Sequence, residues 1–564
     1  MNTKRVVEVV LASVLFVIIM FPSKAPAEEF AADLVVLNAN VITINADNPR
    51  AEAFAVLNGR IIAVGTTSEM KALIGKATKV MDAQGKTVTP GFNDAHLHPG
   101  PIYPYKSLHH AISLRPKSIK TMDELINALK EKAKITPKGQ WIRGSRYQDT
   151  KLGRHPTRWD LDKASTEHPI RISHSSGHVS VVNSFALKSA KVTKETPDPP
   201  GGAFDRDENG EPNGILRERA SGVVTAGGPK TPPPTREEQL EGILICFNNF
   251  LSVGITSIQD AGGSPGKIDL YQDAQDAGAT IRISMMIRDR YLPDLKKINI
   301  RNNFGSDRLK IGAIKSFQGN SLSGRTCWLY EPYVNRADGK TDYYGIPPGR
   351  SQEEFEKLIY EIHEAGFSPA VHSNGDRETD LVLDAFEKAL KRLPKKDHRF
   401  RIEHCSVVNP RILKRIKDLG VVIVPHSYIY EHGDKHEEYG EKRWNWMHPN
   451  GSALELGIPV AGNSDYSVSA AVPLLRIQSM VTRTSAEGKV YGPKQRVTAE
   501  EALRIWTMGS AYASFEEDIK GSIEVGKLAD FVVLSADPTK VDPFTIKDIK
   551  VEKTIIGGKI VYEQ

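Results

Sequence analysis

The chain has 564 residues, of which 40% are hydrophobic and 26% are charged, and its formal net charge is +6 at pH 7. This composition is typical of globular proteins and excludes a fibrous or wholly disordered chain. The mild charge forms no basic stripe, so we expect no nucleic-acid partner, and the length allows several domains or one large α/β barrel with additions.

The first 27 residues differ from the rest of the chain. Lys4 and Arg5 precede an almost unbroken apolar run over residues 9–21, and residues 25–27 read Ala-Pro-Ala. A basic start, a short apolar run and a small-residue cleavage site are the pattern of an export signal. We therefore predict a signal peptide at 1–27, a periplasmic or secreted protein, and no stable membrane anchor after cleavage.

Residues 28–88 read as short strands separated by turns, for example in DLVVLNANVITIN. The same pattern of short apolar runs and turn residues recurs in residues 515–564, with GSIEVGKLADFVVLSAD and VEKTIIGGKIVYEQ. Alternating apolar residues bounded by turn residues indicate strands. We predict that the two ends of the chain together form one small composite β-sandwich domain.

The stretch TPGFNDAHLHPG at residues 89–100 places His96 and His98 one residue apart. In a strand, side chains at i and i+2 point to the same face, so both imidazoles can reach one ion. A turn with two polar residues is the alternative interpretation of a bare H-x-H. We expect this stretch to be the first strand of a barrel that covers residues 89–514.

Residues 103–234 interrupt the predicted barrel after its first strand. They contain WIRGSRYQDT, HPIRISHSSGHVSVVNSFAL and a Pro/Gly-rich stretch, and they end at PKTPPPTREEQ. About 130 residues exceed what a loop without structure of its own normally spans. This segment is therefore predicted to be an inserted α/β subdomain, after which the barrel resumes at GITSIQDAG.

Helices and strands alternate in the second half of the chain. SQEEFEKLIYEIHEAGF has apolar residues at helical spacing, a capping box of Ser351 and Glu354, and Gly366 as a stop. His363 lies off the apolar stripe, so we expect it on the surface. The strand-like SPAVHS follows, and the same unit recurs before VVIVPHS and IPVAGNSD. This rhythm is typical of a (β/α)8 barrel of the TIM type.

Polar side chains stand where the predicted barrel strands end. Such barrels collect their chemistry at the carboxyl ends of the strands. The residues at these ends are His372, His404, His426 and Asp465. Together with the two histidines of the first strand, they are expected to meet at one mouth of the barrel.

Four motifs occur in a fixed order: PGFNDAHLHPG, AVHSNGDR, RIEHCS and GNSDYSVSAAVP. With them the chain resembles the amidohydrolase superfamily, and within it the amidohydrolase-3 branch that includes N-substituted formamide deformylases. Matching segments such as KGSIEVGKLADFVVL extend the resemblance from about Leu34 to the C-terminus.

The resemblance implies a metal-dependent hydrolase with one or two divalent ions, zinc by the chemistry of its ligands. In the family, a lysine that ends a middle strand is often carboxylated and bridges two metals. The match here is Lys315, although the following turn reads Gln-Gly-Asn-Ser instead of the usual Asp-Gly-Ser. An unmodified lysine would favour a mononuclear site. The implied metal ligands are His96, His98, Lys315, His372, His404 and Asp465.

A metal ion lowers the pKa of a bound water from about 15.7 toward 7, which supplies the nucleophile of such hydrolases. Asp465 is predicted to be the general base, which takes the proton of the water and passes it to the leaving nitrogen. Metal ligation alone is its alternative role. His178, in SSGHVSVVNS, is expected to polarise the substrate carbonyl, and a structural histidine is the alternative.

The long loop SYIYEHGDKHEEYGEKRWNWMHPNG after VVIVPHS is both aromatic and charged. Loops on this face of a barrel determine specificity. His426, Tyr428 and Trp444 are therefore candidates for substrate binding, with the alternative that the aromatic residues only fix the loop to the barrel. His432, His436 and His448 lack the spacing of ligands.

These observations predict an exported metal-dependent amidohydrolase that uses metal-activated water on a non-peptide carbon–nitrogen bond, of amide or N-formyl type. An esterase, lactonase or deaminase on the same site is the alternative within enzymes, because a fold does not determine a reaction. A binding protein without catalysis is the alternative outside enzymes. The expected partner is a small-molecule substrate, and a homodimer is one option for the assembled protein.

Overall fold

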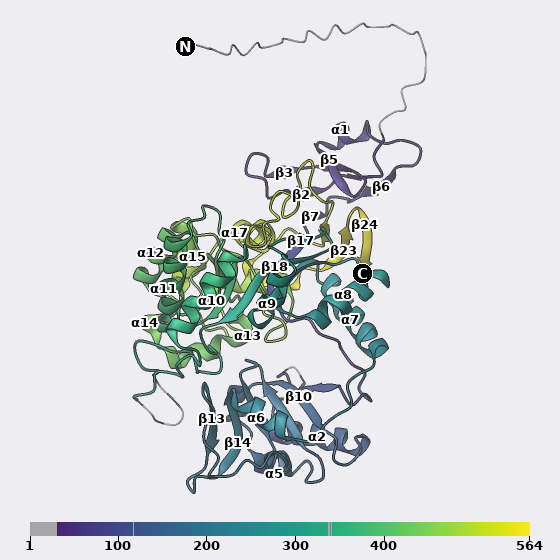
Figure 1. Ribbon diagram of the computed structural model, residues 1–564. Coiled ribbons are helices and arrows are strands. Elements are labelled where there is room, and N and C mark those ends of the chain that lie inside the picture. Colours follow the sequence, from purple (N-terminus) through teal and green to yellow (C-terminus); the bar gives the residue numbers. More distant parts are fainter. Residues whose placement is uncertain (1–30, 117, 335, 337–338, 340) are drawn as a thin grey trace, which may run out of the picture.

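The computed structural model of the protein describes residues 31–116, 118–334, 336, 339 and 341–564 (Figure 1). The predicted signal peptide at 1–27 lies outside these residues. Among the helices of the described ranges, none combines the length and the apolarity that crossing a bilayer requires.

Seven parallel strands form a nearly closed barrel in the middle of the molecule (Figure 1). Each strand pairs with the next one along the chain, as expected when the connections between them return to the same end of the sheet. The strands are β8 (Phe92–Leu97), β15 (Ile255–Gly263), β16 (Arg282–Arg288), β18 (Leu309–Phe317), β19 (Pro369–Ser373), β20 (Arg401–His404) and β21 (Val422–Pro425). The short β17 (Phe304–Gly305) pairs antiparallel with β18.

Residues 460–465 lie in the gap between β21 and β8. Ala461 N donates to Ile423 O on one side, and Ala95 N donates to Gly462 O on the other. Asp465 N donates to His96 O at 2.9 Å. This segment takes the place predicted for the eighth strand, but its pairing with β21 is limited to an isolated bridge between Ile423 and Val460.

Helices cover the outside of the barrel, and their sequence signals act as predicted. In α10 (Gln352–Glu364), Ser351 and Glu354 form the capping box and Phe355, Ile359 and Ile362 are fully buried. His363 does not lie on the surface. It is 4% exposed, and its Nε2 is hydrogen-bonded to Leu393 O, because the end of a neighbouring helix covers this side of α10.

The other helices of the barrel region are α7 (Arg236–Leu251), α8 (Pro265–Asp276), α9 (Leu292–Lys297), α11 (Asp376–Arg392), α12 (Pro410–Leu419), α13 (Ile429–His432), α14 (Glu441–Trp444), α15 (Asn450–Glu455), α16 (Pro473–Thr482), α17 (Ala499–Arg504) and α18 (Ser510–Ala513). Most of them contribute buried apolar side chains to one continuous core with the barrel strands, whereas Ile429 of α13 and Trp444 of α14 belong to a separate cluster.

A separate six-stranded sheet, which we call the side sheet, lies at one end of the molecule (Figure 1). Its strands are β9 (Ala111–Ser113), β10 (Ile142–Tyr147), β11 (Ile170–His174), β12 (Val179–Val182), β13 (Gly202–Arg206) and β14 (Pro212–Glu218). The helices of this segment are α2 (Met122–Ile135), α3 (Asp149–Leu152), α4 (Arg158–Asp162), α5 (Ser184–Ser189) and α6 (Ala220–Gly227). The side sheet therefore falls within the segment 103–234, and it has a core of its own.

Two further sheets lie at the opposite end (Figure 1). One consists of β1 (Leu34–Leu37), β4 (Ala53–Leu57), β5 (Arg60–Gly65) and β6 (Lys79–Asp82), with α1 (Thr67–Lys71) beside it. The other combines β2 (Asn40–Ile42), β3 (Arg50–Ala51) and β7 (Thr87–Pro90) with β22 (Phe531–Leu534), β23 (Val551–Ile556) and β24 (Lys559–Glu563). Antiparallel pairing of β7 with β22 joins the two ends of the chain directly before β8 begins.

Candidate metal centre

The ring of His96 is held by a buried carboxylate. His96 lies in β8, and its Nδ1 is hydrogen-bonded to Glu403 of β20, with both side chains inaccessible to solvent. Arg401 Nε donates to Glu403 Oε1 at 2.5 Å. A carboxylate at one ring nitrogen fixes the orientation of the imidazole and leaves the other nitrogen available to a ligand. His96 Nε2 is therefore the atom that faces the centre of the barrel mouth.

Three other predicted site residues lie near this atom. Asp465 Oδ1 lies 3.7 Å from His96 Nε2 and 3.5 Å from His98 Nε2. Lys315 Nζ, from β18, lies 3.3 Å from His96 Nε2. Burial raises the pKa of Asp465, but hydrogen bonding to His98 and the nearby His96 outweigh it and hold this pKa below its ordinary value. Asp465 is thus a carboxylate at neutral pH.

Lys315 is fully buried, which is unusual for a lysine. Burial lowers the pKa of its ammonium group from 10.5 to about 7, although the carboxylates of Glu403 and Asp465 act in the opposite direction. A substantial fraction of the side chain is therefore a neutral amine near neutral pH. Only the neutral amine can add carbon dioxide to form a carbamate.

His372 and His404 end two adjacent strands, β19 and β20, and their ring centroids are 4.6 Å apart. Burial, followed by the charges of neighbouring groups, holds the pKa of both imidazoles well below the ordinary value. His404 Nδ1 is buried without a hydrogen-bond partner among the described residues. His372 Nε2 lies 3.0 Å from Asn320 O, so this nitrogen already has a protein partner.

The backbone is strained at two of these residues. His404 has φ of 75° and Asp465 has φ of 49°, in the left-handed region that side chains rarely adopt. Each such residue costs on the order of 1–3 kcal/mol and persists only where the surrounding structure holds it. Left-handed residues of this kind concentrate at functional sites, which supports a functional role for this end of the barrel.

Asp94 connects the first strand to the segment that carries Asp465. It is fully buried and accepts hydrogen bonds from His96 N at 3.2 Å and from Ser464 N at 3.1 Å, as well as from the Ser464 hydroxyl. Burial raises the pKa of Asp94 to about 7 despite these hydrogen bonds. The acid of the H-x-H motif therefore fixes the positions of two site residues, a role that the spacing of the motif does not reveal.

The donor set fits a divalent metal ion. His96, His404 and Asp465 each offer a ligand atom, and these atoms lie within 4.8 Å of one another. The imidazoles are neutral and the acid is ionised, which are the protonation states that metal binding requires. The unpartnered Nδ1 of His404 is the kind of buried polar atom that a bound ion would satisfy. His98 Nε2 and Lys315 Nζ lie next to these atoms, whereas the ring of His372 adjoins that of His404, with centroids 4.6 Å apart.

His178 reaches the centre from the side sheet. It lies between β11 and β12, and its ring centroid is 5.2 Å from that of His372. Its Nδ1 is 2.7 Å from Glu218 Oε2. Burial lowers the pKa of His178, but the charge of Glu218 outweighs burial and raises it above its ordinary value.

Glu378 organises the turn after Lys315 whose sequence departs from the family pattern. Its carboxylate accepts backbone hydrogen bonds from Asn320, Trp328 and Asn374, at 2.6–2.9 Å. Asn320 in turn presents its carbonyl oxygen to His372. The unusual turn is therefore held by a glutamate from α11, about 60 residues further along the chain.

A stack of buried rings extends from the centre into the long loop after β21. His426 stacks on His404 at a centroid distance of 4.1 Å, and Tyr428 lies 4.2 Å from His426. Beyond them, His448 Nε2 is 3.0 Å from His436 Nε2. The loop histidines are thus buried, an arrangement that their spacing along the chain does not indicate.

Trp444 fixes this loop. Its Nε1 donates to His436 O at 2.6 Å, and its ring packs edge-on against Tyr491. It is only 8% exposed. These contacts agree with the alternative that the tryptophan holds the loop to the barrel.

Glu403→Gln tests the support of His96. We expect metal affinity to fall about 10–100-fold, the usual effect of losing a carboxylate behind a ligating histidine. We also expect a loss of about 3–5 kcal/mol in unfolding free energy, because Arg401 keeps a buried charge without its partner. Titration in zinc buffers and thermal unfolding measure the two effects. Glu387→Gln, at a partly exposed position on α11, is the control, and unchanged metal affinity in Glu403→Gln would contradict the role assigned to Glu403.

Known proteins are similar to this chain over most of its length. A family model described as "Amidohydrolase family" matches residues 79–562. The N-substituted formamide deformylase of Arthrobacter pascens is 29% identical over 546 residues, which cover 94% of this chain and 98% of that protein. The putative amidohydrolase YtcJ of Bacillus subtilis (strain 168) is 28% identical over 542 residues, 93% of this chain and 98% of that protein.

A solved structure is similar over nearly the whole chain. It is an uncharacterized metal-dependent hydrolase from Pyrococcus furiosus, with 27% sequence identity and a TM-score of 0.68. The match covers 90% of this chain and 100% of that one.

Proposed function

This chain belongs to the amidohydrolase family, and from that premise we propose that it is an exported metal-dependent hydrolase of a non-peptide carbon–nitrogen bond, of amide or N-formyl type. The observation that carries the proposal is the meeting of His96, His98 and Asp465 around a buried lysine at the mouth of the barrel. The deformylase relative supports the choice of bond.

We extend the proposal to the organisation of the chain. The segment 460–465 would serve as the eighth strand of a (β/α)8 barrel over residues 89–514. The side sheet would be the core of an inserted α/β subdomain over 103–234. Residues 28–88 and 515–564 would form a composite β-sandwich, supported by the pairing of β7 with β22.

The residues that would hold the metal are His96, His98, Lys315, His372, His404 and Asp465, with one or two zinc ions as the proposed complement. A bound cation of this kind acts as a Lewis acid and lowers the pKa of a water from about 15.7 toward 7. The neutral amine of Lys315 would attack carbon dioxide, form an N–C bond and release one proton, which leaves an anionic carbamate. This group offers two oxygen ligands where an ammonium would repel cations.

Asp465 would act as the proton carrier. Its carboxylate accepts a proton from the attacking water and returns it to the leaving nitrogen when the carbon–nitrogen bond breaks. Its low pKa keeps it ionised before the reaction, and its place beside both His96 and His98 brings it to the centre.

His178 would stabilise the negative charge that develops on the substrate carbonyl oxygen. Because Glu218 raises the pKa of His178, the ring is protonated more readily than an ordinary histidine and can donate a hydrogen bond. His426 and Tyr428 would line the substrate side, and Trp444, whose contacts hold the loop, would act through the position of that loop.

Removal of metal tests the proposal. Dialysis against a chelator should abolish hydrolysis of N-formyl amines, and added zinc should restore it, since the proposed nucleophile depends on the ion. Activity that is indifferent to the chelator would contradict the proposal. A panel that also contains N-acyl amino acids, lactones, esters and aminated heterocycles distinguishes an amidohydrolase from an esterase, lactonase or deaminase. Metal binding without turnover of any member would favour a catalytically silent binding protein.

We also propose a cellular location and an oligomeric state for the protein. A signal peptide at residues 1–27 would direct the protein to the periplasm or outside the cell, and the mature chain would keep no membrane anchor. Its partner would be a small-molecule substrate, not nucleic acid, and the assembled form would be a monomer or a homodimer. Mass measurement of the exported protein checks cleavage after Ala27 and the oligomeric state.

A further inference from the structure

A pocket lies between the side sheet and the wall of the barrel, and we call it the second pocket to distinguish it from the metal centre. Its volume is about 860 Å³, which lies within the range of small-molecule sites. Residues of β10 and of the stretch after β9 form one side. The end of α7, the start of α13 and the stretch 466–472 form the other.

Two arginines of the side sheet point into this pocket. β9 and β10 are neighbouring parallel strands, with Ser113 opposite Ser145, so Arg115 and Arg146 emerge at the same edge. The pairing of β10 with β11 shifts between Ser145 and Tyr147, which makes Arg146 the extra residue of a bulge, and its φ is 71°. Bulges redirect side chains near functional sites, and here the bulge turns Arg146 towards the barrel.

The positive charge in the pocket exceeds the negative charge. Glu431 is shared between Arg476, which is fully buried, and Arg115, whose Nη1 lies 3.5 Å from Glu431 Oε1. The Arg146 guanidinium lies over the ring of Tyr466, 4.9 Å from its centroid, and forms no ion pair with the described part of the chain. Burial, and then the charge of Arg146, lowers the pKa of Arg115 to about 10. Lys151 and Glu487 also line the pocket and pair with each other, so its lining carries three cationic side chains, Arg115, Arg146 and Lys151, against the two carboxylates of Glu431 and Glu487.

The rest of the lining is mostly apolar. Phe250 and Val253 line the pocket from the end of α7, and Pro116 and Val472 from the two sides of the junction. The ring of Tyr466 packs edge-on against Phe250, with centroids 5.1 Å apart. A ligand that fits this lining has an anionic end for the arginines and an apolar body for these side chains.

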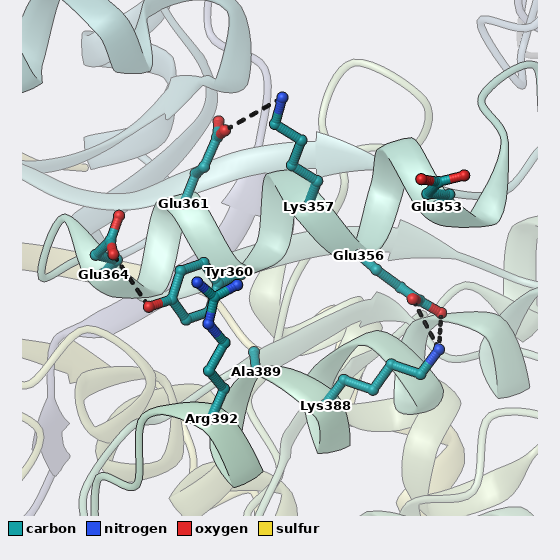
Figure 2. A pocket seen from close by; sticks show the side chains of 9 residues that line it. All are labelled: Glu353, Glu356, Lys357, Tyr360, Glu361, Glu364, Lys388, Ala389 and Arg392. Atoms are coloured by element: carbon teal, nitrogen blue, oxygen red, sulfur yellow. Dashed lines mark hydrogen bonds and ion pairs between the residues drawn. The ribbon is translucent and has the colours of Figure 1, made fainter.

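The groove between α10 and α11 is a useful comparison, because its lysines are paired with glutamates (Figure 2). It is also lined by charged side chains, but Lys388 pairs with Glu356 and Lys357 pairs with Glu361. Arg392 lies over the ring of Tyr360, 3.6 Å from its centroid. Acids and bases alternate there along solvated helix faces, so this groove needs no external counter-ion.

The second pocket is distinct from the metal centre. Asp465 faces His96 and His98, whereas the ring of the next residue, Tyr466, contacts Arg146 and Phe250. Two successive side chains thus point to opposite sides of one backbone segment. A ligand in the second pocket would touch the segment that carries Asp465 without entering the barrel mouth.

We propose that this pocket binds a small organic anion, a carboxylate or a phosphate ester with an apolar or aromatic body, through Arg115 and Arg146. The anionic end supplies a counter-charge to Arg146 and shares Arg115 with Glu431, and the body packs against Phe250, Val253 and Val472. This site is independent of the proposed hydrolysis, because none of its residues belongs to the metal centre.

Calorimetric titration of the metal-free full chain with 4-bromobenzoate and with phenyl phosphate tests the proposal and identifies the preferred anion. We expect Arg146→Gln and Arg115→Gln each to weaken binding at least about tenfold, the usual effect of losing one charge-assisted hydrogen bond. Arg392→Gln is the matched control, since Arg392 also lies over a tyrosine ring, and it should bind like the wild type. Equal affinity in all four proteins, or equally strong binding of the neutral 4-bromobenzyl alcohol, would overturn the proposal.

A second measurement does not depend on the folding of the variants. Crystals of the wild-type protein soaked with 4-bromobenzoate should show anomalous bromine scattering beside Phe250 and Val253, with the carboxylate at Arg115 and Arg146. Bromine only at the metal centre, or at no site in this pocket, would also overturn the proposal.

Discussion

Asp465→Asn is expected to lower turnover by about 10²–10⁴-fold, the contribution of a positioned general base, while fold and metal content are retained. An amide occupies nearly the same volume as the carboxylate and can still offer its oxygen to the site, but it cannot accept and return a proton. The hydrogen bond of the Asp465 backbone to His96 O does not depend on the side chain, so the segment should keep its position.

Initial rates with an N-formyl amine, together with metal analysis and thermal unfolding of the same sample, measure this effect. Asp418→Asn is the matched control, because Asp418 is an exposed acid on α12 that pairs with Lys414. Activity within a few-fold of the wild type would show that Asp465 is not the base. Loss of the metal together with activity would instead indicate that ligation is its main role.

Lys315→Met is the second change with a large expected effect. Methionine fills a similar volume in the buried site but has no amine, so it cannot form a carbamate or offer oxygen ligands. We expect the loss of at least one metal per chain and a fall in activity of more than about 100-fold, beyond the usual effect of losing a group that only supports a ligand. The fold should persist, because replacing a buried amine by an apolar side chain removes a desolvated polar group.

Native mass spectrometry of the wild-type protein under added carbon dioxide should show an increase by the mass of one carbon dioxide, and Lys315→Met should not. Lys414→Met is the control, because Lys414 is an exposed lysine of α12 that pairs with Asp418 and belongs to no proposed ligand set. A Lys315→Met protein with full metal content and full activity would rule out a bridging lysine and favour a site that does not use this residue.

Local patterns predicted the elements that carry the centre. The i, i+2 spacing of His96 and His98 required only that the stretch be extended, and β8 covers His96 while His98 directly follows it. The capping box at Ser351 and the helical spacing of Phe355, Ile359 and Ile362 determined α10 because these signals act within one or two turns. His372 and His404 lie at the ends of β19 and β20, as the strand pattern predicted.

Local sequence patterns did not predict the contacts between distant segments of the chain. Glu403 supports His96 across 307 positions of the chain, and Glu378 holds the turn after Lys315 from another element. His363 was expected on the surface because its own helix gives no sign that Leu393 covers it. The loop histidines at 432, 436 and 448 are buried by tertiary packing, which their spacing does not encode.

The most direct test of the central claim is anomalous diffraction at the zinc absorption edge from crystals grown with zinc. The account predicts an anomalous difference peak between the ligand atoms of His96, His404 and Asp465, next to His98 and Lys315. A structure with this end of the barrel free of metal, or with zinc bound only elsewhere, would contradict it.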